Sequence, residues 1–75
     1  MAERNKTLWQ FGRNIARIRS TAGISQEKLA EMANIDRTYI CGIECGRRNP
    51  GIKNVIAIAR ALGVSLDSLF PVFKP

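Results

Sequence analysis

The residues with the clearest chemistry in this sequence are Arg37 and Thr38, which directly follow Asp36. An arginine guanidinium can donate two parallel hydrogen bonds to guanine, and a threonine can touch a thymine methyl group or donate a hydrogen bond. Arg48 lies in a basic loop further along the chain and could bind either a phosphate or a base. These residue types predict contact with nucleic-acid bases; the alternative for Arg37 is a solvated surface charge.

Amide and ammonium side chains gather where two other helices are expected to begin. Gln26 opens one of them, and Asn49, Lys53 and Asn54 surround the start of the other. Because helix N-termini present unpaired N–H groups that favour phosphates, we expect these four residues to contact a nucleic-acid backbone. Tyr39 has two open alternatives, the sugar-phosphate backbone or packing at the edge of the domain.

The residue types give little support to catalysis or metal binding. The chain has no histidine, its acidic residues are scattered, and no glycine-rich phosphate loop follows a strand pattern. Cys41 and Cys45 lack the partners that a structural zinc site needs. We therefore expect a protein that is not an enzyme and that uses no cofactor and no metal.

The elements that must position these side chains are two short amphipathic runs, joined by a turn that contains Asn34. Ser25 and Asp36 are suited to cap the two runs, and asparagine tolerates the positive φ that such a turn requires. Gly46 can close the second run. Residues 25–46 therefore predict a helix-turn-helix, whose second helix enters the major groove of DNA.

One face of that second helix is apolar, with Ile40 and Ile43. A glycine in mid-helix, such as Gly42, lowers helix stability by up to about 1 kcal/mol relative to alanine. Close approach of the helix to DNA or close packing on a neighbour would explain why a glycine is present. A disulfide between Cys41 and Cys45, one turn apart, would be strained, so we expect two small side chains at or near the DNA surface. A redox switch that blocks DNA binding is the alternative. The opposite face holds Thr38, Cys41, Gly42 and Cys45, with Arg37 at its border.

Three further helices are expected around this motif. The first follows Thr7 as its N-cap, the fourth covers residues 52–62, and the last covers residues 66–70. No strand pattern is present, so we expect an all-α fold of five short helices in a single domain, residues 1–75. Residues 1–6 are polar without periodicity and are expected to fray as an arm.

Arg19 and Glu44 each close an otherwise apolar helix face. A pair between them would fix the angle between the first and third helices. Such a buried ion pair indicates geometry rather than net stability.

Composition limits the partners and the compartment. Twelve basic residues against six acidic residues give a net charge of +6, which favours nucleic acid ahead of an anionic membrane. No apolar run approaches the roughly 18 residues of a membrane span, and the N-terminus lacks the apolar core of a signal peptide. Two cysteines are too few for a secreted disulfide framework, so we expect a cytoplasmic protein with reduced thiols.

The segment from Arg17 to Phe70 resembles the lambda-repressor-like, Cro/C1-type (XRE) helix-turn-helix family, and the resemblance covers about residues 8–70. The subset IDRTYICGIE and RRNPGIKNV is similar to the controller proteins of bacterial restriction-modification systems. The resemblance implies a five-helix lambda-repressor-like domain. It also implies base contacts from Arg37, Thr38 and Arg48, backbone contacts from Gln26, Tyr39, Asn49, Lys53 and Asn54, and a structural Arg19–Glu44 pair.

The resemblance further implies a homodimer formed through the last helices, residues 64–75. An apolar patch at a chain end can serve as an isologous interface. Two recognition helices about one DNA turn apart would then read a palindromic operator. The apolar residues that exceed the needs of a small core are Leu66, Leu69, Phe70, Val72 and Phe73.

The sequence therefore predicts a dimeric, sequence-specific regulator that binds double-stranded DNA and controls a restriction-modification system. Other regulators with the same chemistry are a prophage repressor and an antitoxin that represses its own operon. A protein-interaction module on a degenerate helix-turn-helix fold is the alternative from a different class. No membrane partner and no small-molecule ligand are expected, and control by protein concentration is the natural mode of regulation.

Overall fold

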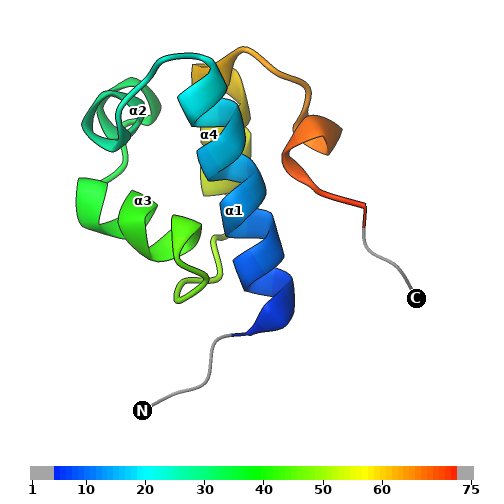
Figure 1. Ribbon diagram of the computed structural model, residues 1–75. Coiled ribbons are helices and arrows are strands. Elements are labelled where there is room, and N and C mark those ends of the chain that lie inside the picture. Colours follow the sequence, from blue (N-terminus) through cyan, green and yellow to red (C-terminus); the bar gives the residue numbers. More distant parts are fainter. Residues whose placement is uncertain (1–4, 73–75) are drawn as a thin grey trace.

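The computed structural model describes residues 5–72 of the 75-residue chain. Within this part the chain is entirely helical and contains no strand, which confirms the expected all-α class. Figure 1 shows α2 and α3 on one side of α1, and η1 on the other side. The elements in chain order are α1 (Lys6–Thr21), α2 (Gln26–Ala33), α3 (Arg37–Glu44), α4 (Ile52–Leu62) and η1 (Leu66–Leu69).

The last element is a short 3-10 helix, so the described chain has four α-helices and one 3-10 turn rather than five helices. The amides of Ser68 and Phe70 bond to carbonyls three residues earlier, at 3.0 and 3.1 Å. The element has only four residues and is followed closely by Pro71. This segment is too short for a series of i to i+4 hydrogen bonds, so the 3-10 pattern forms instead.

Of the three N-cap residues predicted above, Ser25 and Asp36 are confirmed and Thr7 is not. Ser25 Oγ accepts the Lys28 N–H at 3.0 Å, and Asp36 Oδ1 accepts the Thr38 N–H at 2.8 Å, as predicted. The predicted N-cap Thr7 is wrong: the cap of α1 is Asn5, whose Oδ1 accepts the Leu8 N–H at 3.1 Å.

The start of α1 also shortens the expected N-terminal arm. Asn5 is the cap of this helix and Lys6 is its first residue, so neither belongs to a frayed segment. The rest of the predicted arm, residues 1–4, lies outside the described part of the chain.

The turn between α2 and α3 depends on Asn34, which takes the left-handed conformation with φ 56°. Among the described residues it is the only non-glycine residue with positive φ. Its N–H donates to the Glu31 carbonyl at 3.2 Å, and the Ile35 N–H donates to the Ala30 carbonyl at 2.9 Å. The carbonyls at the end of α2 are thereby satisfied, as in a Schellman-type C-cap.

The core lies where α1 meets α3 and η1, and where α2 meets α3 and α4. Leu69 is 0% exposed in this core, so its prediction as a dimer-interface residue is wrong. The 3-10 turn packs against both α1 and α4, and this carries the leucine into the monomer. The large apolar side chains that are fully buried are Ile15, Leu29, Ile40, Ile43, Ile58 and Leu69.

Gly12 allows α1 and α3 to approach closely. A Cβ atom at this position would overlap the Ile43 carbonyl oxygen and would lie 2.8 Å from the Glu44 carbonyl oxygen. Gly46 has φ 76°, and a Cβ there would lie 2.8 Å from Trp9 Cα. The backbone of α1 therefore rests directly against the C-terminal end of α3, which fixes the position of this helix.

Candidate nucleic-acid interface

Arg37 and Thr38 form the start of α3, and both residues are exposed. Neither side chain makes a hydrogen bond or an ion pair with another described residue, although the Thr38 N–H bonds to the Asp36 cap. Their donors are therefore available at the end of the helix that reaches bases in a helix-turn-helix.

Arg48 lies in the loop between α3 and α4, and its stem packs on Gly42. A Cβ at Gly42 would stand 2.5 Å from Arg48 Cγ. The Gly42 carbonyl accepts the N–H groups of Arg47 at 2.9 Å and Arg48 at 3.1 Å. The Arg48 guanidinium carbon lies 5.4 Å from the Tyr39 ring centroid, a cation–π distance.

This packing decides between the two explanations for Gly42. The residue is buried rather than exposed on the face opposite Ile40 and Ile43, because the loop folds back over it. Packing on a neighbour, Arg48, accounts for a glycine in mid-helix.

Tyr39 is half-buried and packs against the core, with the Arg48 guanidinium over its ring. This arrangement is the domain-edge packing that the sequence left open. Its hydroxyl makes no hydrogen bond to another described residue, so it can still meet a phosphate.

Glu44 is 1% exposed and connects the first three helices through its side chain. Arg19 donates from Nε to Oε2 at 2.7 Å and from Nη2 to Oε1 at 3.0 Å, so the structure brings together the expected pair. The hydrogen bond to Glu44 raises the pKa of Arg19 above its ordinary value, with burial acting against it. Gln26 Nε2 donates to Glu44 Oε1 at 2.9 Å.

Gln26 is half-buried, and this bond turns one of its amide hydrogens inward. The amide has a second hydrogen and an oxygen that no described residue occupies. Its contact with a phosphate stays a prediction.

Arg13 is a positioning residue that the sequence reasoning missed. Its Nε and Nη2 both donate to the Glu44 backbone carbonyl, at 3.1 and 2.9 Å, and its guanidinium carbon lies 4.9 Å from the Trp9 ring centroid. It therefore caps the C-terminal end of α3 from α1. No sequence signal singled it out from the other arginines of that helix.

The N-terminus of α4 has no side-chain cap, because its N-cap is Gly51. Lys53 and Asn49 are exposed and Asn54 is half-buried, and none of these side chains bonds to another described residue. The first N–H groups of α4 and these three side chains lie together at one helix end, as a phosphate contact requires.

Cys41 and Cys45 are free thiols on α3 and at its C-cap, both half-buried. Their sulfur atoms lie 3.9 Å apart. No group of three or more histidine, cysteine, aspartate or glutamate residues that could hold a metal is present in residues 5–72.

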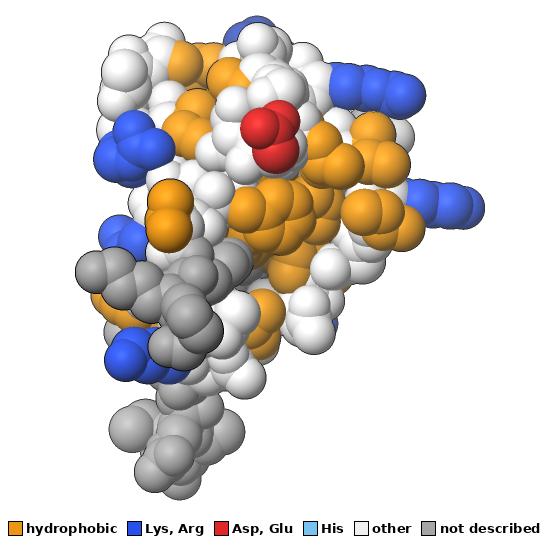
Figure 2. Space-filling model, turned by 90° about the vertical axis from the view of Figure 1, so that its right-hand side faces the viewer, with side chains coloured by type: hydrophobic (Ala, Val, Ile, Leu, Met, Phe, Trp, Pro, Cys, Tyr) orange, Lys and Arg blue, Asp and Glu red, His pale blue; other side chains and the backbone are white. Residues whose placement is uncertain are grey.

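Hydrophobic side chains gather on the face that carries η1, with lysine and arginine side chains at its edges (Figure 2). Leu66, Phe70 and Val72 are 40%, 44% and 90% exposed, so these three predicted interface residues are available to a partner. Phe73, the fifth predicted residue, lies outside the described part of the chain.

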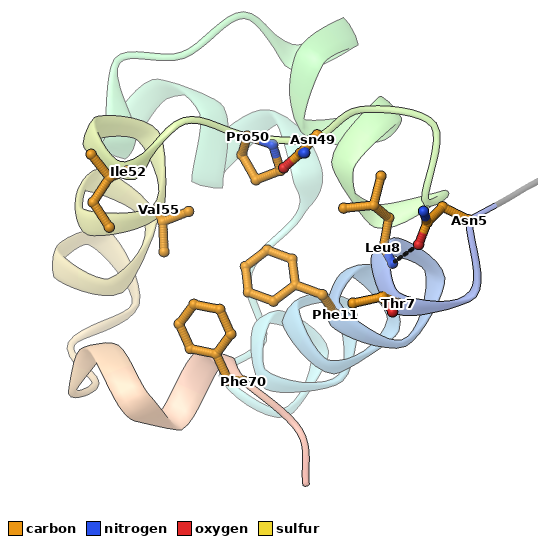
Figure 3. A pocket seen from close by; sticks show the side chains of 9 residues that line it. All are labelled: Asn5, Thr7, Leu8, Phe11, Asn49, Pro50, Ile52, Val55 and Phe70. Atoms are coloured by element: carbon orange, nitrogen blue, oxygen red, sulfur yellow. Dashed lines mark hydrogen bonds between the residues drawn. The ribbon is translucent and has the colours of Figure 1, made fainter. Parts of the chain in front are cut away.

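An open apolar groove of about 620 Å³ lies beside them, between α1, the start of α4 and Phe70 (Figure 3). The Phe11 and Phe70 ring centroids are 4.9 Å apart on one wall. Ile52, on the opposite wall, is 62% exposed. Ile52 was not among the residues predicted for the apolar interface, because it belongs to a different helix from the chain end. Within residues 5–72, no helix combines the length and the apolar character needed to span a bilayer.

The comparisons with known proteins agree with this geometry. The helix-turn-helix family model matches residues 15–69. The control protein C.BamHI of Bacillus amyloliquefaciens is 47% identical over 60 residues, which cover 79% of this chain and 74% of that protein. The control protein C.MunI of a Mycoplasma species is 37% identical over 62 residues, covering 81% and 84%.

A solved structure gives the same result for the fold. The restriction-modification controller protein C.AhdI of Aeromonas hydrophila superposes with a TM-score of 0.83 at 38% identity, covering 84% of this chain and 96% of that one. The chain thus belongs to the Cro/C1-type helix-turn-helix family of DNA-binding transcription regulators, close to the restriction-modification controller proteins.

Proposed function

We propose that this chain is a homodimeric controller protein that binds a palindromic operator and regulates a restriction-modification system in the cytoplasm. The exposed Arg37–Thr38 start of α3 is the observation that carries this proposal. Arg37 and Thr38 contact bases in the major groove, because their side chains extend from a rigidly held helix and have no described partner. Arg48 contacts a third base, and its position is set by the packing of its stem on Gly42 and of its guanidinium over the Tyr39 ring.

Phosphate contacts set the register on the duplex. Asn49, Lys53 and Asn54 stand around the uncapped N-terminus of α4, where helix amides and a cationic side chain act together. Gln26 and Tyr39 contribute the contacts nearer to α3.

Dimerisation places two copies of α3 on one DNA face. The exposed Leu66, Phe70 and Val72 and the groove beside Ile52 supply an apolar surface for an isologous contact. Two such domains read half-sites one helical turn apart. This arrangement makes occupancy depend on protein concentration, because dimer formation precedes binding.

Selection from a random duplex library, followed by titration of the recovered sequence, tests this function. We expect a palindromic consensus and an affinity that falls steeply with salt, as phosphate contacts release counterions. Arg37→Ala should cost roughly 1–3 kcal/mol of binding and relax preference at one position of each half-site. Lys53→Ala is the matched comparison and should weaken binding to all duplexes alike.

Two results contradict the proposal. Binding that is insensitive to salt and indifferent to sequence, or no binding at all, would exclude an operator-binding regulator. An unchanged consensus and affinity in Arg37→Ala would show that α3 does not read bases. A methyltransferase gene and an endonuclease gene beside the coding sequence would support the restriction-modification assignment.

A further inference from the structure

Two thiols stand one helical turn apart on the recognition helix. The Sγ atoms of Cys41 and Cys45 are 3.9 Å apart, and both side chains are half-buried, so solvent reaches each of them. Cys45 is the C-cap of α3 and is followed by Gly46 in a left-handed conformation. The second sulfur therefore sits at the point where the helix ends.

A direct bond between the sulfurs does not fit this geometry. A disulfide needs the sulfurs at about 2 Å and the Cβ atoms at about 4 Å, whereas a helix holds Cβ atoms one turn apart at roughly 5–6 Å. The separation of 3.9 Å leaves room for one bridging atom that bonds to both sulfurs at a bent angle. Tetrahedral zinc needs further ligands, and residues 5–72 hold no set of three or more candidate metal ligands.

We propose that Cys41 and Cys45 form a chelating site for a trivalent arsenical that carries one organic substituent. The arsenic atom of this class accepts two thiolates and keeps its organic group. In the reaction each thiol loses its proton, two As–S bonds form, and the As=O double bond of the reagent breaks. The oxygen leaves as water with the two protons, and the arsenic remains trivalent, so no oxidant or reductant is required.

The position of this site gives it a consequence for DNA binding, which rests on the function proposed above. Thr38, Cys41 and Cys45 follow one another at spacings of three and four residues, so they share one stripe of α3. An arsenical that bridges the two sulfurs adds its organic group to this same stripe, one turn beyond Thr38. The organic group should then exclude Thr38 and its neighbour Arg37 from the bases that they are proposed to contact.

Phenylarsine oxide added to the reduced 75-residue chain tests the chelate. Intact-mass measurement should show one reagent per chain, with loss of both free thiols and release of the reagent by a small dithiol. Cys41→Ser and Cys45→Ser should each lose the adduct when excess monothiol is present, because a single As–S bond exchanges readily. Absence of an adduct in the parent, or an equally resistant adduct in either variant, overturns the site.

A second measurement tests the effect on DNA. The reagent should weaken operator binding by roughly ten- to a hundredfold, the loss expected when one or two base contacts are denied, and a small dithiol should restore it. Each serine variant is compared with its own untreated affinity and should not respond to the reagent. If the adduct forms without changing DNA affinity, the exclusion step is wrong while the chelate stands. If untreated protein binds no DNA, the proposed function fails, and the mass measurement still decides the chelate.

Discussion

Glu44 holds the recognition helix through a charge that is almost completely buried. Its side chain is 1% exposed and accepts hydrogen bonds from Arg19 on α1 and Gln26 on α2. Removing one partner of a buried pair costs more than the pair contributes, because an uncompensated charge remains inside the protein.

We therefore expect Arg19→Met to lower the free energy of unfolding by roughly 3–5 kcal/mol. The double variant Arg19→Met with Glu44→Met should lose less free energy of unfolding than the single variant, because no unpaired charge remains buried. Urea denaturation measures both. Lys28→Ala is the control, because the Lys28–Glu31 pair is exposed, with side chains 58% and 74% accessible, and should contribute less than about 1 kcal/mol. A double variant less stable than Arg19→Met would contradict this account.

The raised pKa of Arg19 fixes the direction of any pH effect from this pair. A cationic group with a raised pKa contributes its stabilisation fully below its unfolded value and loses it only as pH rises through the folded value. Arg19 should therefore contribute no pH dependence to unfolding between pH 6 and 9, a range well below any arginine pKa.

Gly42 should control DNA binding through Arg48 rather than through its own contact. Alanine gains up to about 1 kcal/mol of helix propensity but places its Cβ 2.5 Å from Arg48 Cγ, so the arginine stem must move. We expect Gly42→Ala to change the free energy of unfolding by less than about 1 kcal/mol. Operator affinity should nevertheless fall by roughly 1–3 kcal/mol, as in Arg48→Ala.

The double variant of these two residues separates the contributions. If the glycine acts through the arginine, adding Gly42→Ala to Arg48→Ala should cost little further affinity. Fully additive losses would instead show an independent contact at position 42.

At the scale of elements, the crossing of α1 and α3 depends on Gly12. A Cβ there would overlap the Ile43 carbonyl oxygen, which is backbone and cannot rotate away. We expect Gly12→Ala to destabilise the fold by roughly 1–3 kcal/mol, the usual cost of overpacking, despite the better helix propensity of alanine. Gln10→Ala is the control, since this exposed residue of the same helix makes no side-chain bond to a described residue and also gains helix propensity as alanine. Equal unfolding midpoints for the two variants would argue against this contact.

Most element boundaries could be predicted because local chemistry marks them. Gly51 and Gly63 bracket α4 at its predicted limits of residues 52–62, and Asn34 supplies the left-handed turn that the motif needs. Thr7 failed as a cap because several polar residues precede α1, and only the observed backbone shows that the Asn5 side chain reaches the Leu8 amide.

The remaining errors come from contacts between segments distant in sequence. A helical wheel places Gly42 on the open face, since it cannot represent a loop that folds Arg48 back over the helix. From the sequence, Leu69 is one of the apolar residues that exceed the needs of a small core. The 3-10 turn nevertheless places its side chain in the core. The contact of Gln26 with Glu44 likewise requires knowing how α2 and α3 cross.

At the scale of the whole molecule, the groove-bearing face should set the oligomeric state. For the proposed dimer, Leu66→Asp should shift sedimentation toward the monomer and raise the dissociation constant at least about tenfold, because a charge replaces an apolar side chain that is 40% exposed. Met32→Asp is the matched control, since this methionine is 46% exposed but lines a separate shallow hollow between α2 and α4. Leu69→Asp would instead unfold the monomer. An unchanged dimer in Leu66→Asp would exclude this surface.

One side of α3 is packed against the domain and the other side is exposed. The proposed preference for a particular DNA sequence can therefore be changed without changing the packing. Ile40, Ile43 and the Glu44 carboxylate attach the helix to the rest of the domain, while Arg37 and Thr38 have no described side-chain partner. Exchanging only the free positions should redirect the protein to a new operator without loss of stability. A single scaffold of this kind can therefore carry many different pairs of base-contacting residues.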